Sequence, residues 1–286
     1  MKFPKISVIT PSFNSIHTIE ETIQSVLNQN YPNLEHIVID GGSTDGTVEL
    51  LKKHPHLIWR SERDEGLYHA MNKGITHATG ELIVILNSDD YFRPEALLKT
   101  ADAFQKNPAW DASFGDVVYV DGQGQEIFRR EEAGYSYNVL RYWQNYICHQ
   151  TLFVRKATYD KLGLYRHHEF LYGCDYEFIL RLGREKYIVG HVRAFLVNFR
   201  YHDYGLSADL RVVRDRIDER KIIQREYGVP ACWSKLLSLY GRSLRQFQKL
   251  LYLGKCDLIP GYCFLRKHMR KKTQFSSNSG VNRLEL

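Results

Sequence analysis

The stretch Val84-Ile-Leu-Asn-Ser-Asp-Asp-Tyr-Phe92 is an aliphatic run that ends in two adjacent carboxylates, Asp89 and Asp90. The run from Leu82 to Leu86 shows no alternation of apolar and polar residues, which is typical of a parallel strand covered on both faces. In open α/β sheets ligands bind where such strands end. Carboxylate oxygens suit Mg²⁺ or Mn²⁺, ions that usually share their coordination with substrate phosphates. The pair therefore indicates a metal-diphosphate site, although a solvated turn or a helix N-cap is the commoner role for two such acids.

Upstream of this stretch, strand and helix patterns alternate. Strands are predicted at residues 5–10, 35–40 and 57–60, and helices follow each of them, the first with Asn14 or Ser15 as its N-cap. This alternation, with right-handed crossovers, predicts an α/β fold with a Rossmann-like, mixed but mostly parallel sheet and helices on both faces. The strand ends would bring four loops to one cleft, at residues 11–14, 40–43, 62–66 and 87–90.

The pattern changes after a predicted helix at 94–104. A hairpin is expected from strands at 113–119 and 126–129 around the turn Asp121-Gly-Gln-Gly. Further strands are predicted at 151–154, 188–192 and 195–201, and a helix runs from Asp175 through Leu182. An antiparallel element is therefore expected to join the sheet.

The bulk composition is that of an ordinary globular protein. The chain has 286 residues with 43% apolar content, enough for one large domain or a domain with an appendage. Its longest aliphatic run is five residues, whereas a membrane-spanning helix needs roughly 20. Residues 1–6 also lack the apolar segment of a signal peptide, so we expect a cytoplasmic protein.

The five cysteines are odd in number and scattered, at positions 148, 174, 232, 256 and 263. They form neither the paired spacing of a zinc site nor the density of a disulfide scaffold. We expect them to be reduced and mostly buried.

Positive charge is concentrated at the C-terminal end. The net charge is −5 up to residue 210 and +11 after it. We therefore predict three parts: a catalytic domain at 1–209, a basic helical extension at 210–275, and a disordered tail at 276–286. The extension carries an apolar stripe from Trp233 to Leu251, with basic residues mostly off that face. It is expected to meet a membrane surface or nucleic acid; a solvated face, or a stripe buried in a domain of its own, are the plainer readings.

Four motifs in order resemble those of family 2 glycosyltransferases with the GT-A fold, over residues 4–207. They are Val8-Ile-Thr-Pro-Ser-Phe-Asn, Val38-Ile-Asp-Gly-Gly-Ser-Thr-Asp-Gly-Thr, Asn87-Ser-Asp-Asp and Gly173-Cys-Asp-Tyr-Glu-Phe-Ile-Leu-Arg-Leu. The resemblance implies a nucleoside-diphosphate-sugar donor, a divalent metal (Mn²⁺ or Mg²⁺), and a single displacement that inverts the anomeric centre. It also implies a lipid-linked or saccharide acceptor in cell-surface polysaccharide synthesis of the O-antigen or capsule type, at the inner face of the membrane.

The nucleotide-sugar site is predicted from the loops at the strand ends. Asp40 can accept the imide N–H of uracil, which favours UDP, while Gly41 and Gly42 allow the backbone to approach. Phe13 and Asn14 would form the opposite wall, although Asn14 serving as a cap and Phe13 as a core residue are alternatives. The predicted donor-binding residues are Pro11, Phe13, Asn14, Asp40, Gly42, Ser43, Asp64, Lys73, Asn87 and Ser88.

The metal motif departs from the Asp-x-Asp of many relatives, because its first position is Asn87. An amide can bind ribose but adds no charge, so Asp89 is expected to be the main metal ligand. Asp90 would support or cap it. His202 is a further candidate for metal or phosphate contact, with an ordinary loop histidine as the favoured reading.

The resemblance places the catalytic base at Asp175. On a helix, Phe178, Ile179 and Leu182 share its face, which directs it inward, whereas Glu177 aligns with Arg181 as an exposed pair. A helix cap is the alternative role for Asp175. His149 and Gln150 resemble a family segment that lines the acceptor pocket.

Two other classes of function are weighed. A nucleic-acid-binding protein acting through the basic tail is disfavoured, because the cleft motifs are acidic and the tail has no recognition module. A nucleotidyltransferase also uses a carboxylate-bound metal on an α/β sheet, but the chain lacks a glycine-rich N-terminal loop with Arg and Lys. Sugar transfer without release of pyrophosphate would distinguish a glycosyltransferase from a nucleotidyltransferase.

Overall fold

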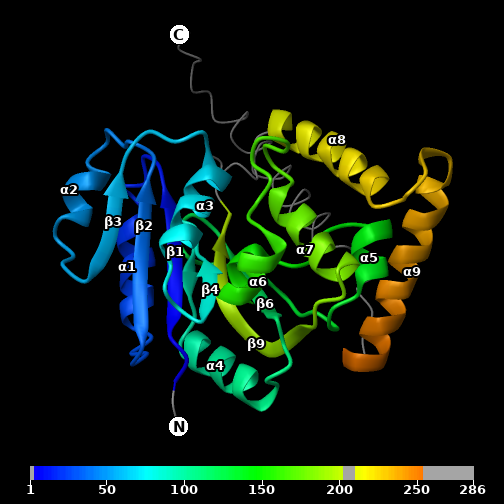
Figure 1. Cartoon of the computed structure of the whole chain (residues 1–286), viewed down its shortest axis with the longest axis horizontal. Coiled ribbons are helices and arrows are strands. Elements are labelled where there is room, and N and C mark those ends of the chain that lie inside the picture. The colour runs from blue at the N-terminus through cyan, green and yellow to red at the C-terminus, as the bar shows by residue number, and fades with distance from the viewer. Residues whose placement is uncertain (1–2, 202–209, 254–286) are drawn as a thin grey trace.

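A computed structural model describes residues 3–201 and 210–253 (Figure 1). A mixed sheet forms its centre, with helices on both faces. The N-terminal half contains β1 (Ile6–Ser12), α1 (Ile19–Leu27), β2 (Leu34–Asp40), α2 (Thr47–Leu51), β3 (Leu57–Ser61), α3 (Leu67–His77), β4 (Leu82–Ile85), β5 (Tyr91–Phe92) and α4 (Ala96–Lys106). The second half contains β6 (Ala112–Val120), β7 (Glu126–Arg130), α5 (Tyr137–Tyr142), η1 (His149–Thr151), β8 (Phe153–Arg155), α6 (Lys156–Leu162), α7 (Cys174–Arg184), β9 (Val189–Arg200), α8 (Leu210–Glu226), η2 (Ala231–Trp233) and α9 (Ser234–Leu253).

The sheet order is β3-β2-β1-β4-β8-β6-β9-β5, and β7 pairs with β6. The first four strands are parallel, with β1 between β2 and β4, as predicted. Their apolar side chains point to both faces: Ile9 and Ile37 pack with α3, whereas Val38 packs with Ile19 and Ile23 of α1. Because both faces are covered, these strands show uniform rather than alternating hydrophobicity.

Pro11 lies inside β1, where the sequence predicts a turn. It is buried and pairs with Ile39 of β2. On the other side of β1, the pairing with β4 ends at Ile9 and Ile85. Pro11 therefore lies beyond the last residue of β1 that pairs with β4. No hydrogen bond to β4 requires the N–H that proline lacks.

The predicted hairpin is confirmed as the antiparallel pair β6–β7. The two strands expected at 188–192 and 195–201 are instead one strand, β9, which runs parallel to β6 with register shifts around Asp116. The strand predicted to begin at Thr151 starts at Phe153, because residues 149–151 form a 3₁₀ turn. The irregularity in β9 explains why the pattern looks like two strands.

Asn14 and Ser15 do not cap the first helix. It begins at Ile19 with Thr18 at the N-cap position, and no side chain caps it. Asn14 instead adopts a positive φ of 48°. Its amide is used between loops, as described below, rather than at a helix end.

The helix α8 packs into the hydrophobic core that the preceding residues form. Ile223 and Tyr227 are buried in the cluster that contains Tyr176 and Phe178 of α7. The carboxylate of Glu219 accepts the backbone N–H groups of Leu171 and Tyr172 at 2.7 and 2.9 Å. In Figure 1, α8 lies over α7, and α9 runs along the outer side next to α5. Among residues 3–201 and 210–253, no helix is long and apolar enough to cross a membrane.

The cysteines follow the prediction only in part. Cys148 and Cys174 are buried and free, whereas Cys232 is exposed. Residues 256 and 263, and the tail predicted at 276–286, lie outside the described residues.

Candidate active site

The loops after β1, β2 and β4 are joined by side-chain hydrogen bonds. The Asn14 N–H donates to Ser43 Oγ at 2.7 Å, and Asn14 Oδ1 accepts the Thr44 N–H at 3.0 Å. Ser15 Oγ lies 2.8 Å from Ser88 Oγ, which connects the first loop to the Asn87–Asp90 segment. The sheet therefore brings three of the predicted motifs together at the carboxyl ends of its strands, as expected.

Asp40 is fully buried at the end of β2, and its carboxylate organises its own loop. Oδ2 accepts the N–H groups of Gly42 and Ser43 and the hydroxyl of Ser61, and Oδ1 accepts the Ser43 hydroxyl at 2.5 Å. A carboxylate can accept about four such bonds. A direct contact between Asp40 and a base stays a prediction, and it would have to exchange one of these donors.

Asp64 lies directly against the Asp40 loop. A Cβ added to Gly41 would come within 2.7 Å of Asp64 Oδ2, so only glycine allows this approach. Gly42 adopts φ +86°, a conformation that also favours glycine. Lys73 Nζ is 2.8 Å from Glu62 Oε1. A contact between Lys73 and phosphate would require it to leave this pair.

Phe13 is 64% exposed at the mouth of the joined loops. This exposure rules out the core reading of Phe13. An exposed aromatic ring beside a glycine-containing loop is suited to stacking on a flat ligand.

Asp90 is buried, and both of its carboxylate oxygens are occupied. Oδ1 accepts the Arg200 N–H at 2.8 Å and Oδ2 accepts Gln150 Nε2–H at 2.5 Å. Burial, followed by the neighbouring charge of Asp89, raises the pKa of Asp90 well above its usual value. Asp90 therefore supports the loop, whereas Asp89 is only partly buried.

Gln150 does not line an acceptor pocket. Its side chain is fully buried and bonded to Asp90, and Cys148 Sγ donates to its Oε1 at 2.9 Å. The prediction for Gln150 is therefore corrected: it positions Asp90. The direction of a side chain on a short 3₁₀ turn could not be read from the sequence.

His149 lies between the Asn87 segment and Asp175. Its Nε2 is 3.3 Å from Asn87 Oδ1, and its Nδ1 is 3.8 Å from Asp175 Oδ2. Burial lowers the pKa of His149, and the charges of Asp175 and Asp89 oppose that effect. His149 therefore connects the predicted metal loop to the predicted base. His202 lies outside the described residues.

Asp175 is in the first turn of α7, but it is not the cap. Gly173 occupies the N-cap position, and no side chain caps the helix. The Tyr68 hydroxyl donates to Asp175 Oδ1 at 3.0 Å, and Asn145 Nδ2–H donates to Oδ2 at 3.3 Å. Burial and the charge of Asp175 raise the pKa of Tyr68 well above its usual value, so Tyr68 stays a hydrogen-bond donor.

Glu177 is buried, contrary to the prediction of an exposed pair with Arg181. Its Oε2 is 3.0 Å from Arg181 Nη2, its Oε1 is 3.4 Å from Arg166 Nη1, and the Tyr227 hydroxyl donates to Oε1 at 2.7 Å. The helical spacing was read correctly. The exposure of Glu177 was predicted wrongly, because Tyr227, 50 positions further along the chain, covers this face of α7.

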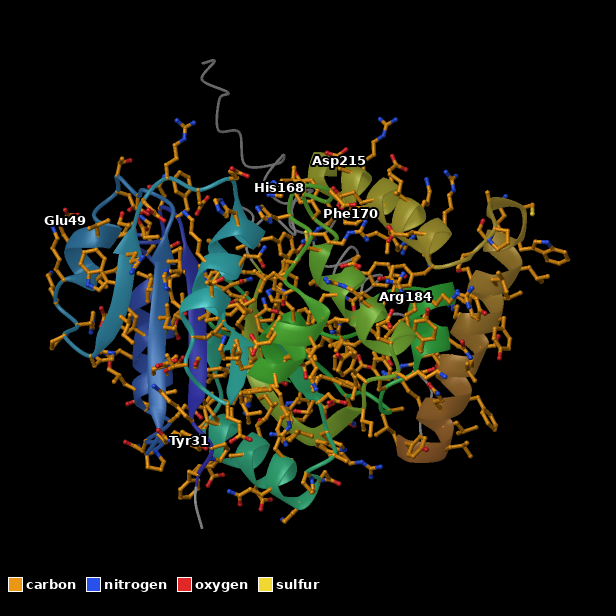
Figure 2. All side chains as sticks on the ribbon, viewed as in Figure 1. Tyr31, Glu49, His168, Phe170, Arg184 and Asp215 are labelled. Carbon is orange, nitrogen blue, oxygen red and sulfur yellow. The ribbon has the colours of Figure 1, made fainter. Side chains whose placement is uncertain are left out.

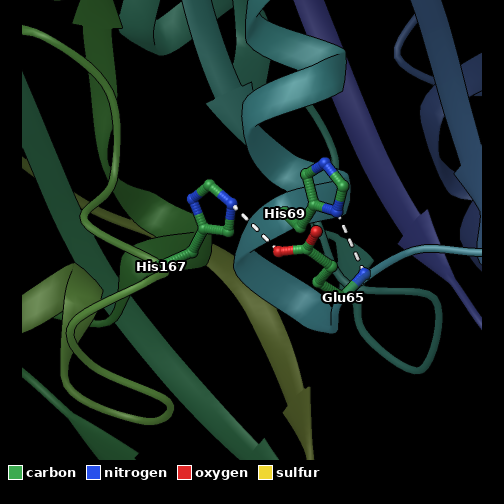
Figure 3. A group of neighbouring side chains, drawn as sticks. All are labelled: Glu65, His69 and His167. Carbon is green, nitrogen blue, oxygen red and sulfur yellow. Dashed lines mark hydrogen bonds and ion pairs between the residues drawn. The ribbon is translucent and has the colours of Figure 1, made fainter.

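Glu65, His69 and His167 form a cluster near the start of α3 (Figure 3). The Glu65 N–H donates to His69 Nδ1 at 3.0 Å, and Asn72 Nδ2 lies 3.0 Å from His167 Nδ1. Asn72 Oδ1 accepts the Tyr165 N–H, so its Nδ2 is a donor to His167. Both imidazoles thus carry their proton on Nε2, an arrangement that holds the loop in place and leaves no lone pair there for a metal.

Three supporting residues were missed by sequence reasoning: Tyr68, Asn145 and Arg200. The Arg200 Nε–H donates to the Asp89 backbone oxygen at 3.0 Å, and its Nη1–H donates to Gly122 O at 2.9 Å. Each acts on a residue more than 25 positions away in sequence. Because these contacts join distant parts of the sequence, no local pattern assigned the three residues a role.

Comparisons with known proteins agree with this geometry. Residues 7–163 match the model of the family described as Glycosyl transferase family 2. A curated relative, an uncharacterized glycosyltransferase of Mycobacterium tuberculosis, is 36% identical over 186 residues, which cover 62% of this chain and 68% of that protein. The TuaG glycosyltransferase of Bacillus subtilis, described as a putative teichuronic acid biosynthesis enzyme, is 38% identical over 142 residues, or 47% and 56% of the two chains.

Solved structures share the fold. TarS 1–349 of S. aureus in complex with UDP-GlcNAc aligns with a TM-score of 0.59 and 19% identity, over 87% of this chain and 73% of that one. The same protein with UDP aligns with a TM-score of 0.54 and 17% identity, over 90% and 95%. The architecture is the GT-A fold of sugar transferases. The chain belongs to glycosyl transferase family 2 and is a glycosyltransferase.

Proposed function

We propose that this protein transfers a sugar from a nucleoside diphosphate, UDP by preference, to a hydroxyl group with inversion at the anomeric carbon. The observation that carries the proposal is the position of His149 between Asn87 and Asp175. A base and a diphosphate-binding loop on either side of one space are what an in-line displacement requires.

Asp175 is the proposed general base. Its carboxylate would remove the proton of the acceptor hydroxyl as that oxygen attacks. Tyr68 and Asn145 each donate to one of its oxygens, so they fix its direction. His149, neutral because of burial, would line the acceptor side of the same space.

The donor would lie over the joined loops. Phe13 offers an exposed ring on which the nucleotide base would stack. Asn14, Gly42, Ser43 and Asp64 would surround the rest of the nucleotide sugar. The structural relatives described with UDP-GlcNAc and with UDP support a UDP-linked donor. Asp40 and Lys73 stay in the proposal as groups that exchange partners when the donor binds.

A divalent metal, Mn²⁺ or Mg²⁺, fits the donor set at Asn87–Asp90. Both oxygens of Asp90 are taken by Gln150 and Arg200, so Asp89 would supply the carboxylate. Asn87 would add its amide oxygen by releasing His149 Nε2. This small set suits an ion that takes most of its ligands from diphosphate and water. When bound, the ion would offset the negative charge of the departing diphosphate.

The acceptor is proposed to be lipid-linked or a saccharide, in surface polysaccharide synthesis of the O-antigen or capsule type. The relatives named for teichuronic acid biosynthesis and for PGL/p-HBAD biosynthesis, the latter from Mycobacterium bovis, support this class. We place the enzyme at the cytoplasmic face of the membrane. Family membership favours sugar transfer over the nucleotidyltransferase and nucleic-acid-binding readings.

A thermal-shift panel tests the donor site. UDP, GDP, CDP and dTDP are each added with and without Mn²⁺ to the wild type, to Asp89→Ala and to the exposed control Asp160→Ala. A ligand of the native state raises the melting temperature. We expect UDP with Mn²⁺ to stabilise the wild type and the control but not Asp89→Ala. No shift with any nucleotide would overturn the proposal, and release of pyrophosphate instead of UDP during turnover would replace it with nucleotidyl transfer.

A further inference from the structure

The helix α9 packs on the protein through its polar face. Gly241, Arg245 and Lys249 are the buried residues of this helix. Arg245 is 1% exposed, forms an ion pair with Glu132, donates to Gly134 O at 3.1 Å, and lies 3.9 Å from the ring centre of Tyr146. A Cβ on Gly241 would lie 3.1 Å from Trp143, so the helix approaches α5 closely there.

Leu237 and Leu244 of α9 are half-buried, whereas six other apolar residues of this helix face away from the protein. At about 100° per residue, they form a stripe about 120° wide, centred opposite Arg245. They are between 50% and 65% exposed: Leu236, Leu239, Tyr240, Phe247, Leu250 and Leu251, hereafter the outer stripe. In Figure 2, side chains on the free side of α9 project away from the rest of the molecule.

This orientation speaks against the two plainer readings of the extension, whereas its contact with a membrane surface stays a prediction. The stripe is not buried in a domain of its own, and the basic residues Arg245 and Lys249 are not on a solvated face. An amphipathic helix normally covers its apolar stripe with the core. A continuous exposed stripe of this kind marks an interaction surface.

Charge identifies the partner. Lys235 and Arg242 are exposed along one edge of the outer stripe, and residues 254–286, which follow α9, contain seven basic and two acidic side chains. Packing of two copies through α9 would bring two positively charged segments together, which repel each other. A surface of anionic lipid would attract them instead, and helices with an apolar stripe beside basic residues lie in the plane of such surfaces.

We propose that α9 lies on a membrane rich in anionic lipids, with the outer stripe at the boundary between headgroups and acyl chains. Exposed Trp233, directly before the helix, is suited to the headgroup level. The inference deepens the proposed function, on which it rests for the location of the acceptor. Its test requires no sugar transfer, so the two can fail separately.

The experiment is flotation of the full chain with two kinds of vesicle: phosphatidylcholine alone, and equal parts of phosphatidylcholine and phosphatidylglycerol. The stripe variant carries Leu239→Gln, Phe247→Gln and Leu250→Gln. The control carries Ile58→Gln, Ile188→Gln and Ile222→Gln, which change three similarly exposed apolar residues outside α9. We expect wild type and control to float with the anionic vesicles, and the stripe variant to bind at least tenfold more weakly.

Two companion measurements test whether something other than a membrane covers the outer stripe. Sedimentation without lipid would show a wild-type dimer that becomes monomeric in the stripe variant if a second copy covers α9. A lower melting temperature of the stripe variant with unchanged vesicle binding would show that residues 254–286 cover it. Either result, or equal flotation of stripe variant and wild type, overturns the proposal.

Discussion

The hydroxyl of Tyr68, at the start of α3, donates a 3.0 Å hydrogen bond to the carboxylate of Asp175, at the start of α7. The two helices come from opposite halves of the chain, so this bond fixes the proposed base relative to the nucleotide half of the site.

Tyr68→Phe should lower kcat/KM by about tenfold to a hundredfold, because a hydrogen bond to a charged group contributes roughly 1.5–3 kcal/mol. Tyr135→Phe is the matched control, since its hydroxyl donates to Ile179 O on the same helix. An equal loss of kcat/KM in both variants would reduce Tyr68 to a packing role.

Asp175→Asn should lower kcat by about 10²- to 10⁴-fold, the usual contribution of a positioned base. Nucleotide binding, measured as the thermal shift with UDP and Mn²⁺, should be unchanged because Asp175 lies on the acceptor side of His149. Retention of wild-type kcat would assign the base elsewhere in the cleft.

Glu177→Ala should lower the free energy of unfolding by roughly 3–5 kcal/mol, because it leaves Arg166 and Arg181 without a buried partner. Asp102→Ala, which removes the exposed pair with Lys106, should cost less than about 1 kcal/mol. Urea unfolding of both variants makes the comparison. Similar costs would show that Glu177 is solvated in solution, as its sequence spacing suggested.

The protein should lose stability in mild acid because of His36. Burial lowers its pKa from 6.5 to about 3, so the native state keeps it neutral while the unfolded chain takes up a proton. Stability is therefore full above the unfolded pKa and falls by about 1.4 kcal/mol per pH unit as the pH drops from 6.5 toward 3. His36→Gln should flatten this slope between pH 6.5 and 4.5 in urea titrations, whereas the exposed control His17→Gln should keep it.

Glu35 adds a second loss at lower pH. Its hydrogen bonds with Lys5, Ser7 and Thr79 outweigh its burial and lower its pKa from 4.5 to about 2. A carboxylate with a lowered pKa stabilises the native state above the unfolded value and loses that effect as the pH falls toward the native value. In His36→Gln the slope should therefore become steeper below about pH 4.5. A flat profile below pH 4.5 would contradict this assignment.

The parallel half of the sheet could be predicted because its signals are local. Uniform apolar strands such as Leu82–Ile85 and the polar residues at their ends are adjacent in sequence. The hydrogen-bond partners of those polar residues are distant in sequence. Asp40 is held in part by Ser61, Asp90 by Arg200, and Glu177 by Tyr227, 50 positions away.

The orientation of α9 shows the same limit. Its spacing predicts an amphipathic helix, but the inner side is decided by the pair between Arg245 and Glu132, which are 113 positions apart. Hydrophobic periodicity assumes that the apolar stripe is the buried one. That assumption fails where a buried ion pair and a close glycine contact position the helix instead.

The hydrogen bonds that join Asn14 to Ser43 and Ser15 to Ser88 have a consequence for protein engineering. Exchanging one of these loops for the loop of a relative would break hydrogen bonds to the others. The nucleotide specificity of that relative is therefore not carried by a single segment. A chimaera that changes the accepted nucleotide should need all three loops replaced together, as one inherited unit.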